Sequence, residues 1–222
     1  MTDPRELAGR TWEGVTALLE ALDEIDLTRP SLCAGWAVVD VLHHLQFDLV
    51  RALTACASPV DAVPTVDAAT YWQAWSAAAD PVQEARGVRS TRIQAAAYRG
   101  PEGLLALWRD TAPAAQRALL ARRPDERVAT QGHVITVNDL ARSLVVEATV
   151  HHLDCLPSLG DVPRPSAESV VEVRRTAEQV LATPLPPGND ESWALKAAGR
   201  VPLSPGDRSA LGDAARAFPL LG

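Results

Sequence analysis

The strongest constraint on the fold is a hydrophobic repeat at three- and four-residue spacing in several long segments. In the first segment Trp12, Val15 and Leu19 recur at this spacing, which places them on one face of a helix. Segments 37–56 and 137–155 carry the same repeat. Each such helix must bury its apolar face against another element, and strand signals are few. The pattern therefore predicts an all-α helical bundle.

Capping residues and breaks predict the limits of the other elements. Asp67, Asp80 and Thr136 stand at N-cap positions, where a side-chain oxygen can accept from the first free backbone N–H groups. Pro113 is expected to kink or interrupt its helix. In the tail we expect an extended segment over 191–203 and one short capped helix over 204–218, and we expect a loop over 122–135. The predicted helices span about residues 4–23, 37–56, 68–79, 81–98, 102–121, 137–155 and 166–182.

Composition excludes several classes of protein. The 222 residues include 21 Lys and Arg against 28 Asp and Glu, a net charge of −7, whereas nucleic-acid binding needs clustered basic residues. No run reaches the ~18 apolar residues of a membrane helix, and the N-terminus lacks a signal-peptide pattern. An odd number of cysteines without a CxxC pair favours reduced thiols in the cytoplasm. We expect Cys33, Cys56 and Cys155 to be buried as small apolar residues.

The histidines carry the strongest chemical signal. Four of the five form two adjacent pairs, His43-His44 and His151-His152. Glu147 and His151 lie four residues apart on the leucine-bearing face of one predicted helix, so their side chains meet on one turn. A carboxylate on a buried face needs a partner or a cation. A metal site and a plain hydrogen-bonded core pair are the two interpretations of this spacing.

The first histidine pair could supply a third metal ligand. On a helical wheel His43 and His44 fall on opposite sides of the leucine stripe, so periodicity does not choose between them. Two imidazoles and a carboxylate suit zinc or a similar divalent ion. Three protein ligands also leave one coordination position open, which is typical of catalytic rather than structural sites.

Two motifs resemble the mycothiol-dependent maleylpyruvate isomerase family, which belongs to the DinB-like metal-binding bundles. The first is the turn and helix start in residues 31–45, SLCAGWAVVDVLHHL, and the second is a Glu-x-x-x-His-x-x-Asp helix. The tail adds Ala198-Gly199-Arg200 and Phe218-Pro219, which resemble the Gly-Arg turn and Phe-Pro ending of relatives. The matching motif positions are Cys33, Gly35, Trp36, Val38, Asp40, Val41, His44 and Leu45, then Glu147, His151 and Asp154.

This resemblance implies a fold and a metal site. The fold is an all-α, DinB-like four-helix bundle over residues 1–160, with a short appendage over 161–222 made of a helix and an extended or helical tail. The metal ligands are His44, Glu147 and His151, so the resemblance selects His44 over His43. The metal is most often zinc, and nickel and manganese are alternatives.

Other residues receive weaker predictions. Asp40 could orient a histidine behind the metal or interact with the helix dipole. Asp154 could support His151 or lie solvated at the helix end. Cys155 could approach the metal, with burial as the alternative, while His43, His133 and His152 are expected on the surface or in hydrogen bonds. One of three arginines could hold a carboxylated substrate, and the alternative for each of the three is an exposed charge. These arginines are Arg51, Arg142 and Arg200.

The resemblance implies an enzyme that activates mycothiol on a divalent metal. Coordination ionises a thiol, so its sulfur becomes a nucleophile toward a small electrophilic substrate. Addition alone gives a thiol S-transferase, and addition followed by bond rotation and elimination gives a cis–trans isomerase. The alternatives are a metal-dependent hydrolase and a non-catalytic metal-binding module. The sequence leaves open the substrate, the native metal and whether the protein is a monomer or a homodimer.

Overall fold

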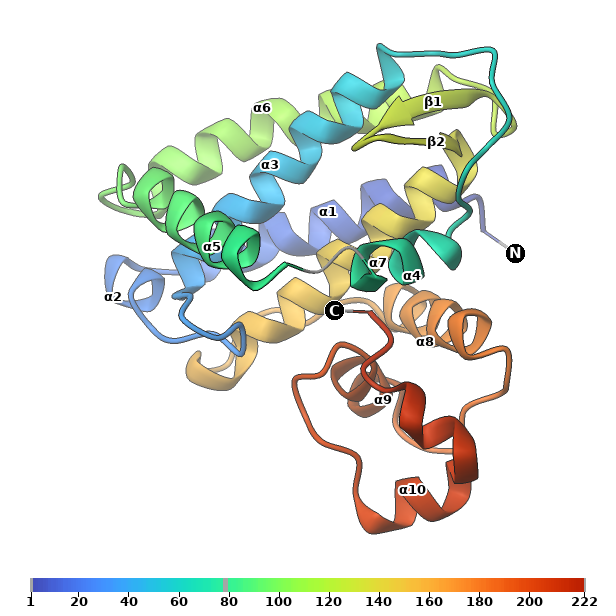
Figure 1. Cartoon of the computed structure of the whole chain (residues 1–222). Coiled ribbons are helices and arrows are strands. Elements are labelled where there is room, and N and C mark those ends of the chain that lie inside the picture. The colour runs from blue at the N-terminus through green and yellow to red at the C-terminus, as the bar shows by residue number, and fades with distance from the viewer. Residues whose placement is uncertain (1, 78–79, 222) are drawn as a thin grey trace.

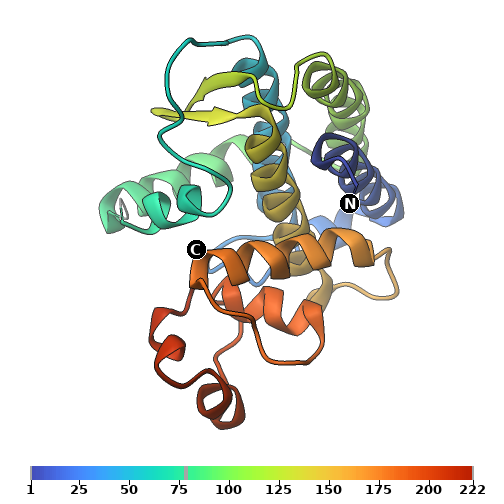
Figure 2. The ribbon, with the colours of Figure 1, turned by 90° about the vertical axis from the view of Figure 1, so that its right-hand side faces the viewer.

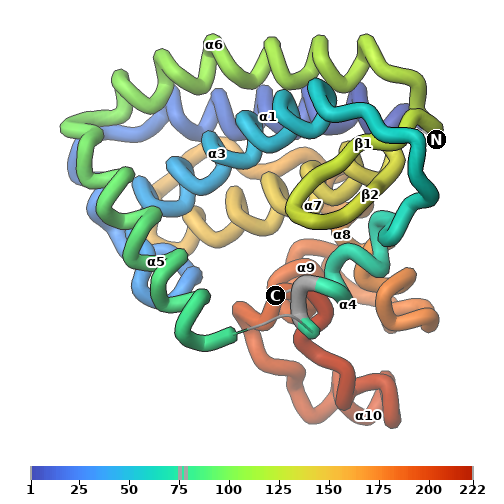
Figure 3. The backbone as a smooth tube through the Cα atoms, turned by 45° about the horizontal axis from the view of Figure 1, so that its top comes forward, coloured from blue at the N-terminus to red at the C-terminus, as the bar shows by residue number. Residues whose placement is uncertain are grey.

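Four long helices form the body of the protein (Figure 1), and the fold is an all-α helical bundle. The computed structural model describes residues 2–77 and 80–221. Helix α1 packs against α6 and α7, and α3 packs against the same two helices, which closes a ring of four (Figure 3). None of the described helices is both long enough and apolar enough to cross a membrane. The four helices are α1 (Pro4–Ala21), α3 (Val38–Cys56), α6 (Pro101–Leu120) and α7 (Val137–Cys155).

The predicted helix starts follow from local capping. The Asp3 side chain accepts a hydrogen bond from the backbone N–H of Arg5 at the start of α1. Thr136 accepts one from Asp139 at the start of α7, and these bonds satisfy backbone donors that have no partner within the helix. Helix α7 spans the predicted residues, while α1 ends two residues before the predicted limit.

Helix α6 runs through Pro113 without a break, so the predicted interruption is wrong. Its buried residues lie on both sides of the proline and include Trp108, Ala112 and Ala115. Trp108 is fully buried and donates its Nε1–H to Thr16 Oγ1 at 3.0 Å. Packing against α1 and α3 along the full length of α6 thus stabilises the helix on both sides of the missing hydrogen bond.

The predicted loop over 122–135 contains a small hairpin instead. Strands β1 (Arg127–Thr130) and β2 (His133–Thr136) pair antiparallel, with Arg127 opposite Thr136. The two turn residues, Gln131 and Gly132, have φ angles of 48° and 81°, as a tight hairpin turn requires. Four-residue strands are too short to show a clear alternating pattern, which is why the sequence did not indicate them.

Shorter helices cover the bundle. Helix α2 (Glu24–Leu27) lies before the turn that leads into α3, α4 (Thr70–Ala77) contacts α8, and α5 (Pro81–Ala95) packs on α3. The predicted helix over 68–79 corresponds to α4, although its last two residues lie outside the described part of the chain. Helix α5 ends three residues before its predicted limit.

The C-terminal segment packs beside α7 (Figure 2). It contains α8 (Ala167–Leu181), α9 (Asp190–Ala197) and α10 (Pro205–Leu211), together with the 3₁₀ helices η1 (Leu156–Ser158) and η2 (Gly212–Ala217). The apolar residues of this segment share one buried cluster with Val146 and Val150 of α7. A boundary near residue 160 therefore stays a prediction.

Two predictions for the tail are wrong. The segment expected to be extended contains α9, whose N-cap Asn189 accepts from the N–H of Ser192. Burial of Trp193 and Ala197 against α8 stabilises this short helix, which its local pattern alone would not. The single helix expected over 204–218 is divided into α10 and η2 at Gly212, whose φ of 57° ends the α-helix.

Candidate metal centre

Helices α3 and α7 bring the three predicted metal ligands together. His44 lies on α3, and Glu147 and His151 lie one turn apart on α7. His44 Nε2 is 3.0 Å from Glu147 Oε1, and His151 Nε2 is 3.8 Å from the same oxygen. One ligand atom from each residue lies within 4.8 Å of the other two. Contact between α3 and α7 therefore converts two separate sequence motifs into one donor set.

Asp48, which lies one helical turn beyond His44 on α3, adds a second carboxylate that was not among the predicted site residues. Its Oδ2 lies 3.4 Å from His44 Nε2, and its Oδ1 accepts a 2.8 Å hydrogen bond from Arg51 Nη1. Burial raises the pKa of Asp48. Burial also acts to raise the pKa of Glu147, but the hydrogen bond from His44 and the charge of His151 outweigh it and hold that pKa at about 2.

The polar atoms of this site fit a cation. A neutral His44 can donate only one proton from Nε2, and Glu147 lies closer to that nitrogen than Asp48 does. Asp48 Oδ2 is buried and has no hydrogen-bond partner in the part of the chain that the structure describes. The Arg51 guanidinium contacts Asp48 only through Oδ1, so a cation near His44 Nε2 would stabilise Oδ2 and the Glu147 carboxylate in this buried site. Two nitrogens and one carboxylate oxygen are suitable ligands for zinc.

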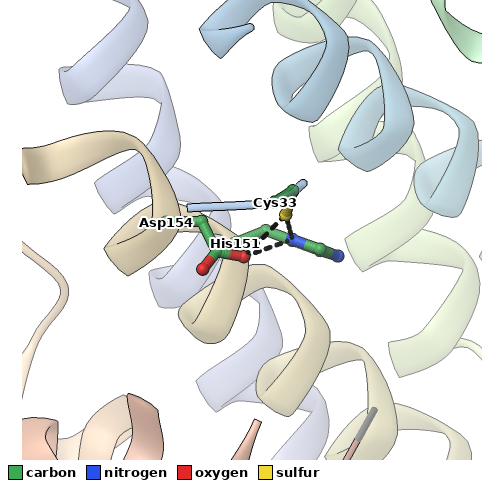
Figure 4. A group of neighbouring side chains, drawn as sticks. All are labelled: Cys33, His151 and Asp154. Atoms are coloured by element: carbon green, nitrogen blue, oxygen red, sulfur yellow. Dashed lines mark hydrogen bonds and ion pairs between the residues drawn. The ribbon is translucent and has the colours of Figure 1, made fainter. Parts of the chain in front are cut away.

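His151 is oriented from behind by Asp154. His151 Nδ1 is 2.9 Å from Asp154 Oδ2 (Figure 4), which leaves Nε2 directed toward Glu147. Asp154 is fully buried, so its predicted alternative as a solvated helix-end residue is wrong. Arg200 donates from Nε to Asp154 Oδ1 at 2.9 Å and from Nη2 to Oδ2 at 3.2 Å. Burial acts to raise the pKa of Asp154, but the contacts with His151 and Arg200 lower it.

Cys33 belongs to this network, contrary to its prediction as a small apolar core residue. Its Sγ donates to Asp154 Oδ2 at 3.0 Å and lies 3.6 Å from both His151 Nδ1 and Arg200 Nη2. Burial, and then the charge of Asp154, raise the pKa of Cys33 to about 12, so it stays a thiol at neutral pH. Cys33, His151 and Asp154 also lie close enough to hold an ion, but the guanidinium of Arg200 already supplies positive charge there.

The turn before α3 forms one wall of the site. Gly35 has a φ of 79°, which glycine adopts without strain, and Trp36 donates its backbone N–H to Cys33 O at 3.0 Å. The Trp36 ring centroid lies 5.3 Å from that of His44 and 6.2 Å from that of His151. This turn therefore places an indole beside both imidazoles.

In each histidine pair, the residue that is not a candidate ligand lies away from the site. The His43 ring lies 5.7 Å from that of Tyr98, beside α5. His152 is buried, and its Nε2 donates to the carbonyl of Pro163 at 2.9 Å. His133 lies on β2, with its ring 6.5 Å from that of Tyr71.

Other predicted candidates take structural roles. Asp40 Oδ2 accepts from the backbone N–H of Ala37 at 2.8 Å, so it supports the start of α3. Arg142 is buried with Glu172 on α8, and Arg200 is largely covered, so the interpretation of these two as exposed charges is wrong. Cys155 is fully buried, and it is absent from the cation-binding groups found among the described residues.

Residues 8–155 match the family model described as mycothiol maleylpyruvate isomerase N-terminal domain. The chain belongs to this family. The mycothiol maleylpyruvate isomerase match includes all of α3, α6 and α7, with the Cys33–Trp36 turn and the three candidate metal ligands. Arg200, which binds Asp154, lies beyond it. A search of curated proteins and a search of solved structures each found no match.

Proposed function

We propose that this protein is a metal-dependent enzyme that uses mycothiol, either as a thiol S-transferase or as a cis–trans isomerase. The observation that supports this most directly is the set of His44, Glu147 and His151 in a chain of this family. Zinc is the expected metal, and nickel or manganese are alternatives with the same ligand types. We expect the cytoplasm as its compartment and either a monomer or a homodimer.

The chain's own residues prepare the site for a thiol. A divalent cation at the three ligands would lower the pKa of a bound thiol, so that sulfur is a nucleophile at neutral pH. Asp154 holds His151 through Nδ1 and keeps Nε2 free for the cation. The Trp36 ring lies beside both imidazoles, at centroid distances of 5.3 Å and 6.2 Å, and adds an apolar surface next to the ligands. The side chains of His44 and Glu147 are 18% and 25% exposed, so a small molecule can reach them.

Both proposed reactions begin in the same way. The sulfur forms a C–S bond to one carbon of an electron-poor alkene, and the alkene electrons move toward the activating group. Protonation of that adduct gives the product of S-transfer. Rotation about the former double bond, followed by cleavage of the C–S bond, restores the alkene with changed geometry and releases the thiol. The site therefore requires an electrophilic small molecule as its second substrate.

Cobalt substitution tests the proposal. Mycothiol added to the cobalt-loaded protein should produce a sulfur-to-cobalt charge-transfer band and release protons. The His44→Ala variant should lose both effects, whereas the matched His43→Ala variant should keep them, because His43 lies beside Tyr98. Hydrolysis of an ester or amide without thiol, with no spectral change, would support the hydrolase instead. If neither thiol nor substrate alters the cobalt spectrum, the protein is a non-catalytic metal-binding module.

A further inference from the structure

The Asp48 carboxylate has one satisfied oxygen and one that lacks a donor. Arg51 Nη1 donates to Oδ1 at 2.8 Å, whereas Oδ2 is buried and has no hydrogen-bond partner among residues 2–77 and 80–221. The side chain is only 8% exposed. A buried charged oxygen without a donor is costly and rare in native proteins. A bound molecule that carries a donor would remove this cost.

This oxygen lies beside the candidate metal ligands, not among them. Asp48 Oδ2 is 3.4 Å from His44 Nε2. In the described part of the chain, however, Asp48 does not join the group whose ligand atoms all lie within 4.8 Å of one another. Asp48 is therefore placed to contact a molecule bound at the three ligands without being a ligand itself.

A pocket reaches Asp48 through its partner Arg51. The pocket has a volume of about 380 Å³ and lies between α3 and the hairpin turn. Phe47 and Val50 line it and are 48% and 42% exposed, and Arg51 lines its charged side. The Arg51 guanidinium lies 5.1 Å from the centre of the Phe47 ring. Asp48 itself does not line the pocket, so the Asp48–Arg51 ion pair lies between the pocket lining and His44.

We propose that Asp48 Oδ2 accepts a hydrogen bond from a hydroxyl or amide N–H group of the thiol compound whose sulfur is held at His44, Glu147 and His151. Asp48 would thus select thiols that carry such a donor close to sulfur. This inference rests on the proposed function, because it concerns the molecule bound at the same site. Arg51 fixes the carboxylate through Oδ1, so Oδ2 stays directed toward the site. Asp48 is a residue that determines specificity here, and its role needs no change in its own protonation.

Two small thiols of equal length test this role in the cobalt-loaded protein. The probes are 2-mercaptoethanol and 1-propanethiol, which differ by a hydroxyl in place of a methyl group, and the charge-transfer band gives the Kd of each. A hydrogen bond to a charged acceptor should make 2-mercaptoethanol bind about tenfold more tightly, or better. Hydrophobic burial would favour 1-propanethiol, so the two explanations predict opposite orders.

The Asp48→Asn variant sharpens the test. Because Arg51 has only donors, it should hold the amide oxygen, and the amide NH₂ group then faces the site. The preference for 2-mercaptoethanol should fall, because a neutral amide pairs with the hydroxyl less strongly than a charged carboxylate does. The Asp213→Asn variant, at an exposed ion pair with Arg216, should keep the preference. Equal binding of the two thiols to the wild-type protein, or an unchanged preference in Asp48→Asn, would overturn the role of Asp48. Absence of a charge-transfer band with either thiol would overturn the proposed function itself, and this inference with it.

Discussion

Two buried charge clusters lie on different sides of α7, and they differ in whether their charges are satisfied. On the side facing α8, Arg142 Nε donates to Glu172 Oε1 at 2.6 Å, and Arg142 Nη2 donates to Gln179 Oε1 at 2.7 Å. Arg175 lies 3.7 Å from the other Glu172 oxygen. None of these four side chains has a buried polar atom that lacks a hydrogen-bond partner among the described residues.

The cluster facing α3 is not complete in this way. His44 Nε2 lies between Glu147 and Asp48, and one Asp48 oxygen has no donor. Both clusters are largely enclosed and both join two helices, although His44 and Glu147 keep 18% and 25% exposure against 10% for Arg142 and Glu172. The surplus of acceptors over donors is the difference on which the proposed cation site rests.

Removal of one metal ligand should have the largest effect on this comparison. We expect close to one divalent ion per chain in the wild-type protein and almost none in His44→Ala or His151→Ala. The neighbouring variants His43→Ala and His152→Ala should retain the ion, because those side chains contact Tyr98 and Pro163 instead. Elemental analysis after reconstitution with zinc measures this. Loss of the ion from His43→Ala alone would mean that the wrong histidine of the pair was assigned.

The α8-facing cluster should respond in stability and not in metal content. Arg142→Met would leave Glu172 buried without its closest cation, and it should lower the free energy of unfolding by roughly 3–5 kcal/mol. Urea unfolding of the metal-free protein measures this change. The double variant Arg142→Met, Glu172→Met should recover much of the loss, because a well-packed apolar pair can replace a buried ion pair. Loss of metal in either variant would contradict the separation of the two clusters.

His152 should make stability depend on pH without affecting the metal. Burial lowers the pKa of His152 from 6.5 to about 4, although its hydrogen bond to Pro163 opposes this shift. Between these two pH values the unfolded chain binds a proton that the folded chain does not, so stability is lost as pH falls. The shift corresponds to roughly 3 kcal/mol. His152→Gln should remove this part of the pH dependence, as measured by urea unfolding in chelator at pH 7 and pH 4.5. An equal loss of stability between pH 7 and pH 4.5 in both proteins would contradict the assignment of this pH dependence to His152.

Asp154 should give the smallest effect of the four. It contacts His151 through Nδ1 and would act on the cation only through that ring. Asp154→Asn should weaken cation affinity by ~10–100-fold while one ion still binds at saturating metal. Competition with a fluorescent chelator measures the affinity. Arg10→Gln, at an exposed ion pair with Glu168, is the control and should leave the affinity unchanged. Complete loss of the ion in Asp154→Asn would mean that this carboxylate is itself a ligand.

Much of the fold could be predicted from local signals. Thr136 and Asp139 mark the start of α7, and the apolar repeat predicts its length, because capping and helical periodicity involve only residues a few positions apart. The same local rules failed where packing decides. Burial of Trp193 stabilises α9 in a segment that lacks a clear helical repeat, and α6 continues through Pro113 because both of its halves are packed.

In the candidate site, too, local spacing predicts some features and tertiary packing decides the others. The sequence alone placed Glu147 and His151 on one turn of a buried face, since a four-residue spacing is a property of any α-helix. Only the packing of α3 against α7 brings His44 to them, together with Asp48, which lies one turn beyond His44 on the same helix. Likewise, only the return of the C-terminal segment places Arg200 against Asp154 and Cys33. Helical periodicity is set within a few residues, whereas the His44–Glu147 and Asp154–Arg200 contacts join positions 103 and 46 residues apart. Over such separations, tertiary packing decides which side chains meet.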